Sequence, residues 1–292
     1  MSLMQRVDVH QHLWPAQLVD ALRARSKPPY LRDWTLTTAG EPPYEVDPQD
    51  HDPKRRADLD PDTRIIMSLS TPLGIEALDP HEGRPLLDAW HTGVGESPFD
   101  AWVAVSEIDP DLDGLRALLD DGFVGLQVSA TALRSPRALE HLAPVLRVCE
   151  RADAAVLVHP GPCAPTDGAP EWWAAVVDYP AQLQAAWWSW HAVGRTLLPT
   201  LRICFAAGAG LAPAHRERLE ARGGGRLDAD HGVFVDTSSY GRLGLDALRG
   251  SVGLDAIVLG SDRPYAEPID ALLDDADRAA IAVTNPARLL TG

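Results

Sequence analysis

Short apolar runs rich in Val and Ile alternate along the chain with longer segments in which apolar residues recur at helical spacing. Short apolar runs between turn signals are typical of strands buried in a sheet. We identify eight such runs, separated by segments that can form helices. The predicted strands span residues 6–11, 63–70, 100–107, 123–130, 154–160, 201–208, 232–239 and 256–262.

Three of the intervening segments have recognisable starts. Asp111, Ser135 with Pro136, and Pro213 each precede an amphipathic stretch, and these residue types favour the first positions of a helix. Eight strands that each lead into a helix are typical of a (β/α)8 TIM barrel, whereas a doubly wound sheet more often stops at about five to seven strands. We therefore expect an α/β fold in which residues 1–292 form one barrel domain.

Residues 26–62 interrupt the alternation. This segment is rich in proline and charged residues, so it cannot form a long helix and is predicted to be a loop inserted after the first strand. In a barrel, such a loop lies over the active-site mouth. The segment from Gly161 to Tyr179 is predicted to be a second long loop, after the fifth strand. Its Trp172 and Trp173 either form a lid or pocket wall, or pin a solvent-exposed loop.

The first predicted strand carries polar residues at every second position. Because successive strand residues point to opposite faces, Asp8, His10 and His12 are expected on one face, and Val7 and Val9 on the other. The valines are expected to pack against the surrounding helices. Two buried imidazoles need a compensating partner, and one divalent metal ion can serve both. A pair of hydrogen-bonded histidines without a metal explains the same spacing.

Two further strands end in residues of the same kind. His159 ends the fifth strand before Pro160 and Gly161, and Asp262 follows the eighth strand before Pro264. The carboxyl ends of barrel strands meet at one rim. Three histidines and one carboxylate there predict a site for zinc, or for manganese or iron with similar geometry.

These motifs resemble the amidohydrolase superfamily, in particular the amidohydrolase-2 branch that includes aminocarboxymuconate-semialdehyde decarboxylase. The resemblance covers nearly the whole chain, through DVHQH at 8–12, LVHP at 157–160, GSDRP at 260–264 and TNPARLL at 284–290. It implies that His10, His12 and His159 are metal ligands, and that Asp262 binds the metal or its water and accepts the water's proton. Asp8 matches the first position of the motif, but we do not assign it as a ligand.

One position departs from the family pattern. The family usually has a histidine at the end of the sixth strand, in a stretch like H-x-G-G, whereas this chain reads CFAAGAG and has Ala207 there. An alanine can neither polarise a substrate nor transfer a proton, and a missing acid or base commonly costs about 10² to 10⁴ in rate. The candidates for that role are His191, His215, Tyr240 and Arg263. His215 is alternatively a surface helix residue, and His191 alternatively packs on tryptophans.

Other chemistries find less support in the sequence. The chain has only two lysines, Lys27 and Lys54, both in the 26–62 segment. A metal pair bridged by a carboxylated lysine on the fourth strand is therefore excluded, and we predict one metal ion. The cysteines, Cys149, Cys163 and Cys204, include no CxxC pair, and no G-x-S-x-G nucleophile motif is present.

Charge and composition restrict the partners. Lys and Arg total 26 against 42 Asp and Glu, a formal charge of −16, so the chain lacks the cationic surface that nucleic acid or anionic lipid requires. We expect a small-molecule partner. No apolar run is long enough to span a membrane and no leader pattern is seen, so we expect a cytoplasmic protein. The tryptophans at 187–190 either form a homo-oligomer contact or pack on their own barrel.

The functional prediction is a metal-dependent hydrolase. A metal ion lowers the pKa of bound water towards roughly 7, and the resulting hydroxide can attack a lactone, ester or amide. One alternative is a metal-dependent decarboxylase of a small unsaturated or aromatic carboxylic acid. Another is a catalytically weak barrel that retains a metal and binds a metabolite. Trp14, Tyr240 and Arg263 are candidate substrate-binding residues, and Arg263 alternatively pairs with an acidic residue of the rim.

Overall fold

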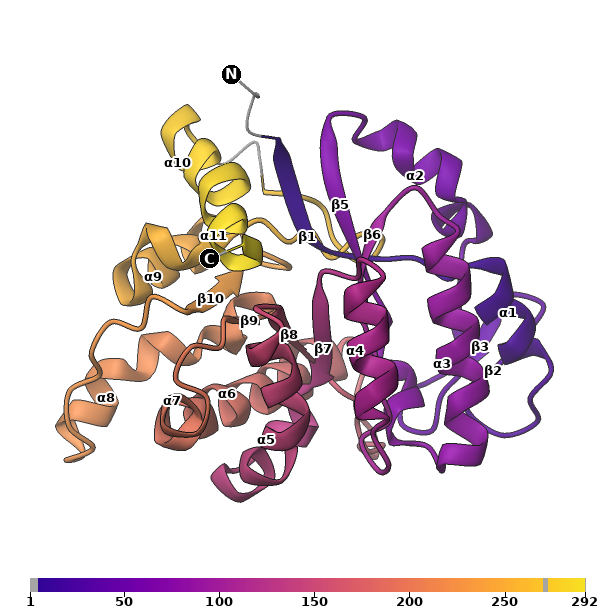
Figure 1. Ribbon diagram of the computed structural model, residues 1–292, viewed down its shortest axis with the longest axis horizontal. Helices are drawn as coiled ribbons and strands as arrows, with labels where there is room; N and C mark the ends of the chain where they lie inside the picture. Colours follow the sequence, from indigo (N-terminus) through magenta and orange to yellow (C-terminus); the bar gives the residue numbers. More distant parts are fainter. Residues whose placement is uncertain (1–4, 270–272, 292) are drawn as a thin grey trace.

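The computed structural model describes residues 5–269 and 273–291. A parallel sheet with the strand order β1-β5-β6-β7-β8-β9-β10-β11 lies at its centre, surrounded by helices (Figure 1). All eight predicted strands are present, although most are shorter than predicted. They are β1 (Arg6–His12), β5 (Thr63–Ser68), β6 (Asp100–Val103), β7 (Gly125–Ser129), β8 (Ala155–His159), β9 (Ile203–Phe205), β10 (Val233–Asp236) and β11 (Ile257–Val258).

The first and last strands meet and close the sheet. The Val9 amide donates to the Leu259 carbonyl at 2.9 Å, and the Asp262 amide donates to the His10 carbonyl at 2.8 Å. The prediction of a (β/α)8 TIM barrel is therefore confirmed. The helices of the described residues are α1 (Ala16–Arg23), α2 (Pro53–Leu59), α3 (Pro80–Gly95), α4 (Leu112–Asp120), α5 (Pro136–Arg151), α6 (Tyr179–Ser189), α7 (Arg195–Leu197), α8 (Arg216–Ala221), α9 (Arg242–Val252), α10 (Asp275–Ala279) and α11 (Asn285–Thr291).

Two of the predicted helix starts are capped as expected. The Asp111 carboxylate accepts from the Gly114 amide at 2.9 Å at the start of α4, and the Ser135 hydroxyl accepts from the Ala138 amide at 3.2 Å at the start of α5. These bonds satisfy amides that have no partner within the helix. The third start is displaced, because a 3₁₀ stretch from Ala207 to His215 precedes α8. No helix of the described residues is both long and apolar enough to cross a bilayer.

The barrel interior is filled by one apolar cluster to which seven of the eight strands contribute. It includes Ile66, Trp102, Leu157 and Phe234, and all four are essentially inaccessible to solvent. The alternate residues of the same strands pack outward against the helices in two larger clusters. The interior is thus a packed core, and the open end above it is formed by the carboxyl ends of the strands.

A β-bulge in β1 contradicts the predicted alternation. Asp8 is paired with Ile65 and Gln11 with Met67, so β1 has one residue more than β5 between these pairs. Val7 and Val9 belong to the interior cluster, and the expectation that they face the helices was therefore wrong. A bulge puts one extra residue in a strand and reverses the facing of the residues after it. Val9 and His12 can for this reason both face inward.

The segment 26–62 is more ordered than a loop. It contains a three-stranded antiparallel sheet of β2 (Tyr30–Arg32), β3 (Thr35–Thr37) and β4 (Tyr44–Glu45), followed by a 3₁₀ turn and by α2. Its small sheet lies beside α1 and α3 (Figure 1). The Tyr179 hydroxyl donates to Glu41 at 2.5 Å, which ties the segment to the start of α6. That it covers an active-site mouth stays a prediction.

Candidate metal centre

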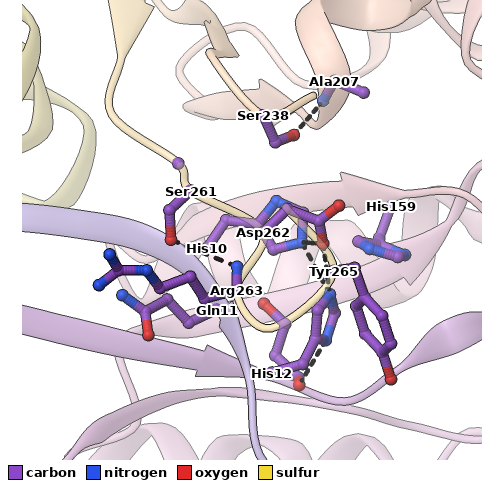
Figure 2. A network of polar contacts seen from close by, with 12 residues as sticks. His10, Gln11, His12, His159, Ala207, Ser238, Ser261, Asp262, Arg263 and Tyr265 are labelled. Carbon is purple, nitrogen blue, oxygen red and sulfur yellow. Dashed lines mark hydrogen bonds and ion pairs between the residues drawn. The ribbon is translucent and has the colours of Figure 1, made fainter. Parts of the chain in front are cut away.

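Three histidine rings and one carboxylate converge at the carboxyl ends of β1, β8 and β11. The centroids of His10, His12 and His159 are 4.8 to 5.0 Å apart, with the rings nearly perpendicular to one another. One candidate ligand atom from each ring and from Asp262 lies within 4.8 Å of the other three. Figure 2 shows the rings gathered around the Asp262 carboxylate.

The Nδ1 atom of each ring has its own partner. The partners are an Asp236 carboxylate oxygen for His10 at 2.7 Å, the Ser68 carbonyl for His12 at 3.0 Å, and the Pro160 carbonyl for His159 at 2.9 Å. Because carbonyl and carboxylate oxygens only accept hydrogen bonds, each Nδ1 is the donor. In a neutral ring, the proton on Nδ1 leaves Nε2 with a free lone pair. The sequence therefore positions three rings whose Nε2 atoms are suited to bind a cation.

The spacing of these atoms suits a small ion. The Nε2 atoms of His10 and His12 are 3.0 Å apart, and an Asp262 oxygen lies 3.5 Å from the first and 3.0 Å from the second. Ligands on a tetrahedral ion with bonds of 2.0 to 2.1 Å are separated by about 3.3 Å. The donor set of imidazoles and one carboxylate fits zinc, manganese or iron.

A strained backbone turns Asp262 towards the histidines. β11 ends at Val258, and Asp262 has φ +63°, a conformation that non-glycine residues rarely adopt. Its amide is held by the His10 carbonyl, and its own carbonyl accepts from the Tyr265 amide at 2.8 Å. Such strain persists where the surrounding structure fixes the residue, commonly at functional sites.

Burial and charge set unlike protonation states in the cluster. Burial lowers the pKa of His10, but the hydrogen bond to Asp236 together with the charges of Asp236, Asp262 and Asp8 outweighs this and raises the pKa to about 9. Burial lowers the pKa of His12, and it lowers that of His159 well below the ordinary value. For Asp262 burial acts to raise the pKa, but the hydrogen bond from His12 and the nearby imidazole charges lower it to about 2.

Asp236 is a site residue that the sequence analysis missed. It ends β10, is fully buried, and accepts hydrogen bonds from His10, from the Ala207 amide at 2.7 Å and from the Ser238 hydroxyl at 2.7 Å. A carboxylate that orients a ligating imidazole is a recurrent part of metal sites. A Cβ on Gly260 would lie 2.7 Å from its Oδ2, so the chain needs glycine there. The signal was available, because Asp236 directly follows the apolar run 233–235 inside the predicted strand 232–239, as His159 follows an apolar run in the fifth.

Asp8 lies behind the cluster and is not one of its ligands. Its carboxylate accepts from the amides of His10 at 3.2 Å and Ser261 at 3.0 Å, and from the Gln11 side chain at 2.7 Å. Gln11 in turn accepts from the guanidinium of Arg56, which is 2% exposed and also contacts the His12 carbonyl at 3.4 Å. This buried network connects the inserted segment with the bulge that carries the histidines.

The position of the missing histidine lies in a left-handed turn. All residues from Ala207 to Leu211 have φ between 44° and 60°. For the non-glycine residues among them this conformation costs roughly 1–2 kcal/mol each. The Ala207 amide donates to Asp236 and to the Ser238 hydroxyl. At this position the chain therefore supplies a backbone donor that holds Asp236, and it places no titratable side chain there.

The predicted substrate residues have different surroundings. Trp14 is buried, stacks on His51 at 4.6 Å between centroids, and donates to the Ser70 hydroxyl at 2.9 Å. Tyr240 is half-buried beside Gly208 and Gly244.

Arg263 extends away from His159 (Figure 2) and pairs with Asp60 and, at 2.9 Å, with Glu267. Pairing with an acidic residue, rather than binding substrate, is the alternative that the sequence left open for Arg263. Tyr265, which the sequence analysis did not single out, lies with its ring centroid 5.4 Å from that of His12.

The other candidates for the histidine role lie elsewhere. The His191 ring packs on Trp187 at 4.5 Å, and burial lowers its pKa to about 4. His215 is exposed on the 3₁₀ stretch before α8. Trp187 and Trp190 are buried in the chain's own core, and Trp172 is 56% exposed beside Trp173.

Comparisons with known proteins bear on the family. No family model matches the chain. A 2-amino-3-carboxymuconate-6-semialdehyde decarboxylase of Dictyostelium discoideum is 28% identical over 164 residues, which are 51% of this chain and 46% of that protein. The match thus spans about half the length of the curated relative.

Solved structures match the fold over nearly the whole chain. An IDCase of Metarhizium anisopliae in apo form has a TM-score of 0.77 at 17% identity, covering 99% of this chain and 97% of that one. The 2,6-dihydroxybenzoate decarboxylase of Rhizobium has a TM-score of 0.70 at 20% identity, covering 99% of each chain. A D314N mutant of the 5-carboxyvanillate decarboxylase of Novosphingobium aromaticivorans, with bound manganese, has a TM-score of 0.72 at 16% identity, covering 99% and 97%.

The predicted resemblance to aminocarboxymuconate-semialdehyde decarboxylase is confirmed by the curated relative, and the solved structures share the fold. These matches also correct the functional prediction, because the curated relative and the Rhizobium and Novosphingobium proteins are decarboxylases. The prediction of a hydrolase was therefore wrong, and the decarboxylase alternative fits the comparisons better. Of the metals considered, manganese is bound in the Novosphingobium structure, and zinc has no specific support.

Proposed function

We propose that this protein is a metal-dependent decarboxylase of a small unsaturated or aromatic carboxylic acid. The observation that carries the proposal is the convergence of His10, His12, His159 and Asp262 at the open end of a barrel. The similarity to decarboxylases favours this chemistry over hydrolysis.

In this proposal one divalent ion, such as manganese or zinc, is held by the three Nε2 atoms and by Asp262. When bound, the ion supplies positive charge that orients an oxyanion of the substrate and stabilises the charge that develops as carbon dioxide leaves. The chain's own groups fix this arrangement, because Asp236 and two backbone carbonyls hold the rings through Nδ1. Preorganised ligands of this kind avoid reorganisation during the reaction.

The surroundings of the cluster suit a flat substrate. Tyr265 is 45% exposed and lies against His12, and its hydroxyl is 3.5 Å from that of Ser70. We assign Tyr265 and Tyr240 to the substrate pocket, with Trp14 behind Ser70 as its support. The inserted segment then covers the mouth, held by Tyr179 on one side and by Arg263 on the other.

A direct assay tests the proposal. The metal-free protein is loaded with manganese or zinc and given 2,6-dihydroxybenzoate, 5-carboxyvanillate and 2-amino-3-carboxymuconate-6-semialdehyde, with release of carbon dioxide as the readout. We expect release from at least one acid, lost on metal removal and reduced at least 100-fold by His159→Ala. His215→Ala, which changes an exposed histidine outside the cluster, is the matched control.

Two outcomes would contradict the proposal. Release that persists after complete metal removal would exclude the metal's role. A stoichiometrically bound ion without turnover of any acid would favour the catalytically weak binding protein instead, for which the alanine at position 207 is the motivation.

A further inference from the structure

Two carboxyl groups at the carboxyl end of the barrel take no part in the cluster: Glu76 is buried and Glu107 is half-buried. Glu107 follows β6, and its amide donates to the carbonyl of Glu76 at 2.8 Å. Glu76 is 2% exposed; its Oε1 accepts from Gln127 at 3.2 Å, and its Oε2 has no hydrogen-bond partner among the described residues. A buried carboxyl oxygen without a partner is costly if charged, so Glu76 favours its protonated form.

Glu107 is connected to the strand that neighbours His159. The Ser129 hydroxyl donates to the Glu107 carboxylate and is 2.7 Å from the hydroxyl of Thr131. Ser129 pairs in register with His159 across β7 and β8. A Cβ on Gly161, two residues after His159, would lie 2.6 Å from the Thr131 hydroxyl. The Glu107 carboxyl is therefore held at the carboxyl end of the barrel, beside β7, the strand that pairs with the His159 strand β8.

The environment raises the affinity of this pair for protons. Burial raises the pKa of Glu107 above its ordinary value of 4.5; Ser129 and the charge of Arg134 lower it again only in part. Burial, together with the charge of Glu107, raises the pKa of Glu76 to about 8. Because the charge of Glu107 contributes to raising the pKa of Glu76, the two groups are coupled, and together they bind protons more readily than isolated carboxyls do.

The other groups near the cluster are poorer donors of a proton. Position 207 has no titratable side chain, and burial raises the pKa of both Tyr240 and Tyr265 above 10. Arg263 is paired with Asp60 and Glu267. Among the described residues of this rim, Glu107 is a carboxyl whose raised pKa favours the protonated form that a general acid needs.

Resting on the proposed function, we propose that Glu107 is the general acid of the decarboxylation, in the role that a strand-six histidine has elsewhere. The bond between the substrate carbon and its carboxylate breaks, carbon dioxide leaves, and the electron pair stays on the carbon. The proton of the Glu107 carboxyl forms the new C–H bond. Glu107 becomes a carboxylate and is reprotonated from solvent, with Glu76 as its neighbouring proton store.

The test compares Glu107→Gln with the wild type on 2,6-dihydroxybenzoate, or on the panel acid that is turned over fastest. We expect kcat to fall about 10²- to 10⁴-fold, the usual contribution of a general acid. Because the acid must carry its proton, wild-type kcat falls as pH rises through the pKa of the pair, and this decline is absent in the variant. Asp109→Asn removes an exposed carboxylate of the same loop and is expected to leave kcat unchanged.

A second readout does not depend on turnover. In metal-free protein with ¹³C-labelled glutamate carboxyls, the resonance lost in Glu107→Gln is expected to titrate with a midpoint above 4.5. A midpoint at or below 4.5, or a Glu107→Gln variant that retains kcat and its decline at high pH, overturns the role of Glu107 and leaves the decarboxylase proposal intact. A wild type that releases no carbon dioxide from any acid overturns both.

Discussion

At the scale of single residues, the cluster depends on the group that holds each ring from behind. His10 is bonded to a fully buried carboxylate, whereas His12 and His159 are bonded to backbone carbonyls. A carboxylate strengthens the basicity of its imidazole more than a carbonyl does, because it carries a charge. We therefore expect Asp236 to affect metal affinity more than the two backbone carbonyls do.

Removal of that carboxylate should weaken metal binding. We expect Asp236→Asn to raise the manganese Kd about 10- to 100-fold, the usual effect of losing such a partner. The measurement is a chelator competition near pH 9, where protons compete little. Asp246→Asn, which changes an exposed carboxylate on α9, is expected to leave the Kd unchanged. Equal effects of the two substitutions would refute the orienting role of Asp236.

Metal binding should also depend on pH. The pKa of His10 is raised to about 9, so below that pH the metal-free site holds a proton that the ion must displace. Apparent affinity for manganese is therefore expected to rise up to about tenfold per pH unit between pH 6 and 8 and to level off near 9. Calorimetry in buffers of different ionisation enthalpy should give about one proton released per ion at pH 7. Affinity that does not change over this range would contradict the assignment.

At the scale of elements, the bulge in β1 and the inserted segment act together. The bulge lets β1 contribute both to the interior cluster and to the metal centre, and Asp8, Gln11 and Arg56 brace it from the outer side. Polar groups so deeply buried are stable only while every member has a partner. The segment 26–62 therefore supports the site structurally, apart from any role at the mouth.

The adjacent arginines of α2 allow a matched test. Arg56→Leu leaves Gln11 without its partner and removes one of the two arginines near the Asp8 carboxylate, so we expect a loss of about 2–4 kcal/mol in the free energy of unfolding. Arg55→Leu changes a side chain that is 44% exposed and should cost no more than about 0.5 kcal/mol. Urea unfolding of the metal-free proteins measures both. Similar losses of unfolding free energy for the two variants would show that the network of Asp8, Gln11 and Arg56 does not stabilise the fold.

At the scale of the whole molecule, the cluster lies on the seam of the barrel. Its residues come from β1, from β8 and from the segment that follows β11. An ion bound there ties the two ends of the chain together, so its binding free energy adds to the stability of the entire fold.

Addition of metal should therefore stabilise the protein as a unit. Free manganese at 100 times its Kd contributes about 2.7 kcal/mol, which raises the melting temperature by about 5 °C in a domain of this size. We expect His159→Ala to abolish the shift and His215→Ala to preserve it, as measured by calorimetry. A shift retained in His159→Ala would place the binding of manganese outside the cluster.

Much of the fold could be predicted from the sequence. The eight strands, the caps of α4 and α5, and the meeting of His10, His12, His159 and Asp262 could be predicted from local patterns, because strand spacing and parallel order bring all strand ends to one rim. The sequence also indicated correctly that position 207 carries no acid or base.

The rest was decided by contacts between distant segments. That His12 faces inward together with Val9 depends on a bulge that pairing with β5 creates, and the role of Asp236 depends on how closely the chain approaches it at Gly260. Arg263 finds its partner in Asp60, about two hundred positions away. Register, close approach and long-range ion pairing are properties of the packed chain, so no periodicity within one segment encodes them.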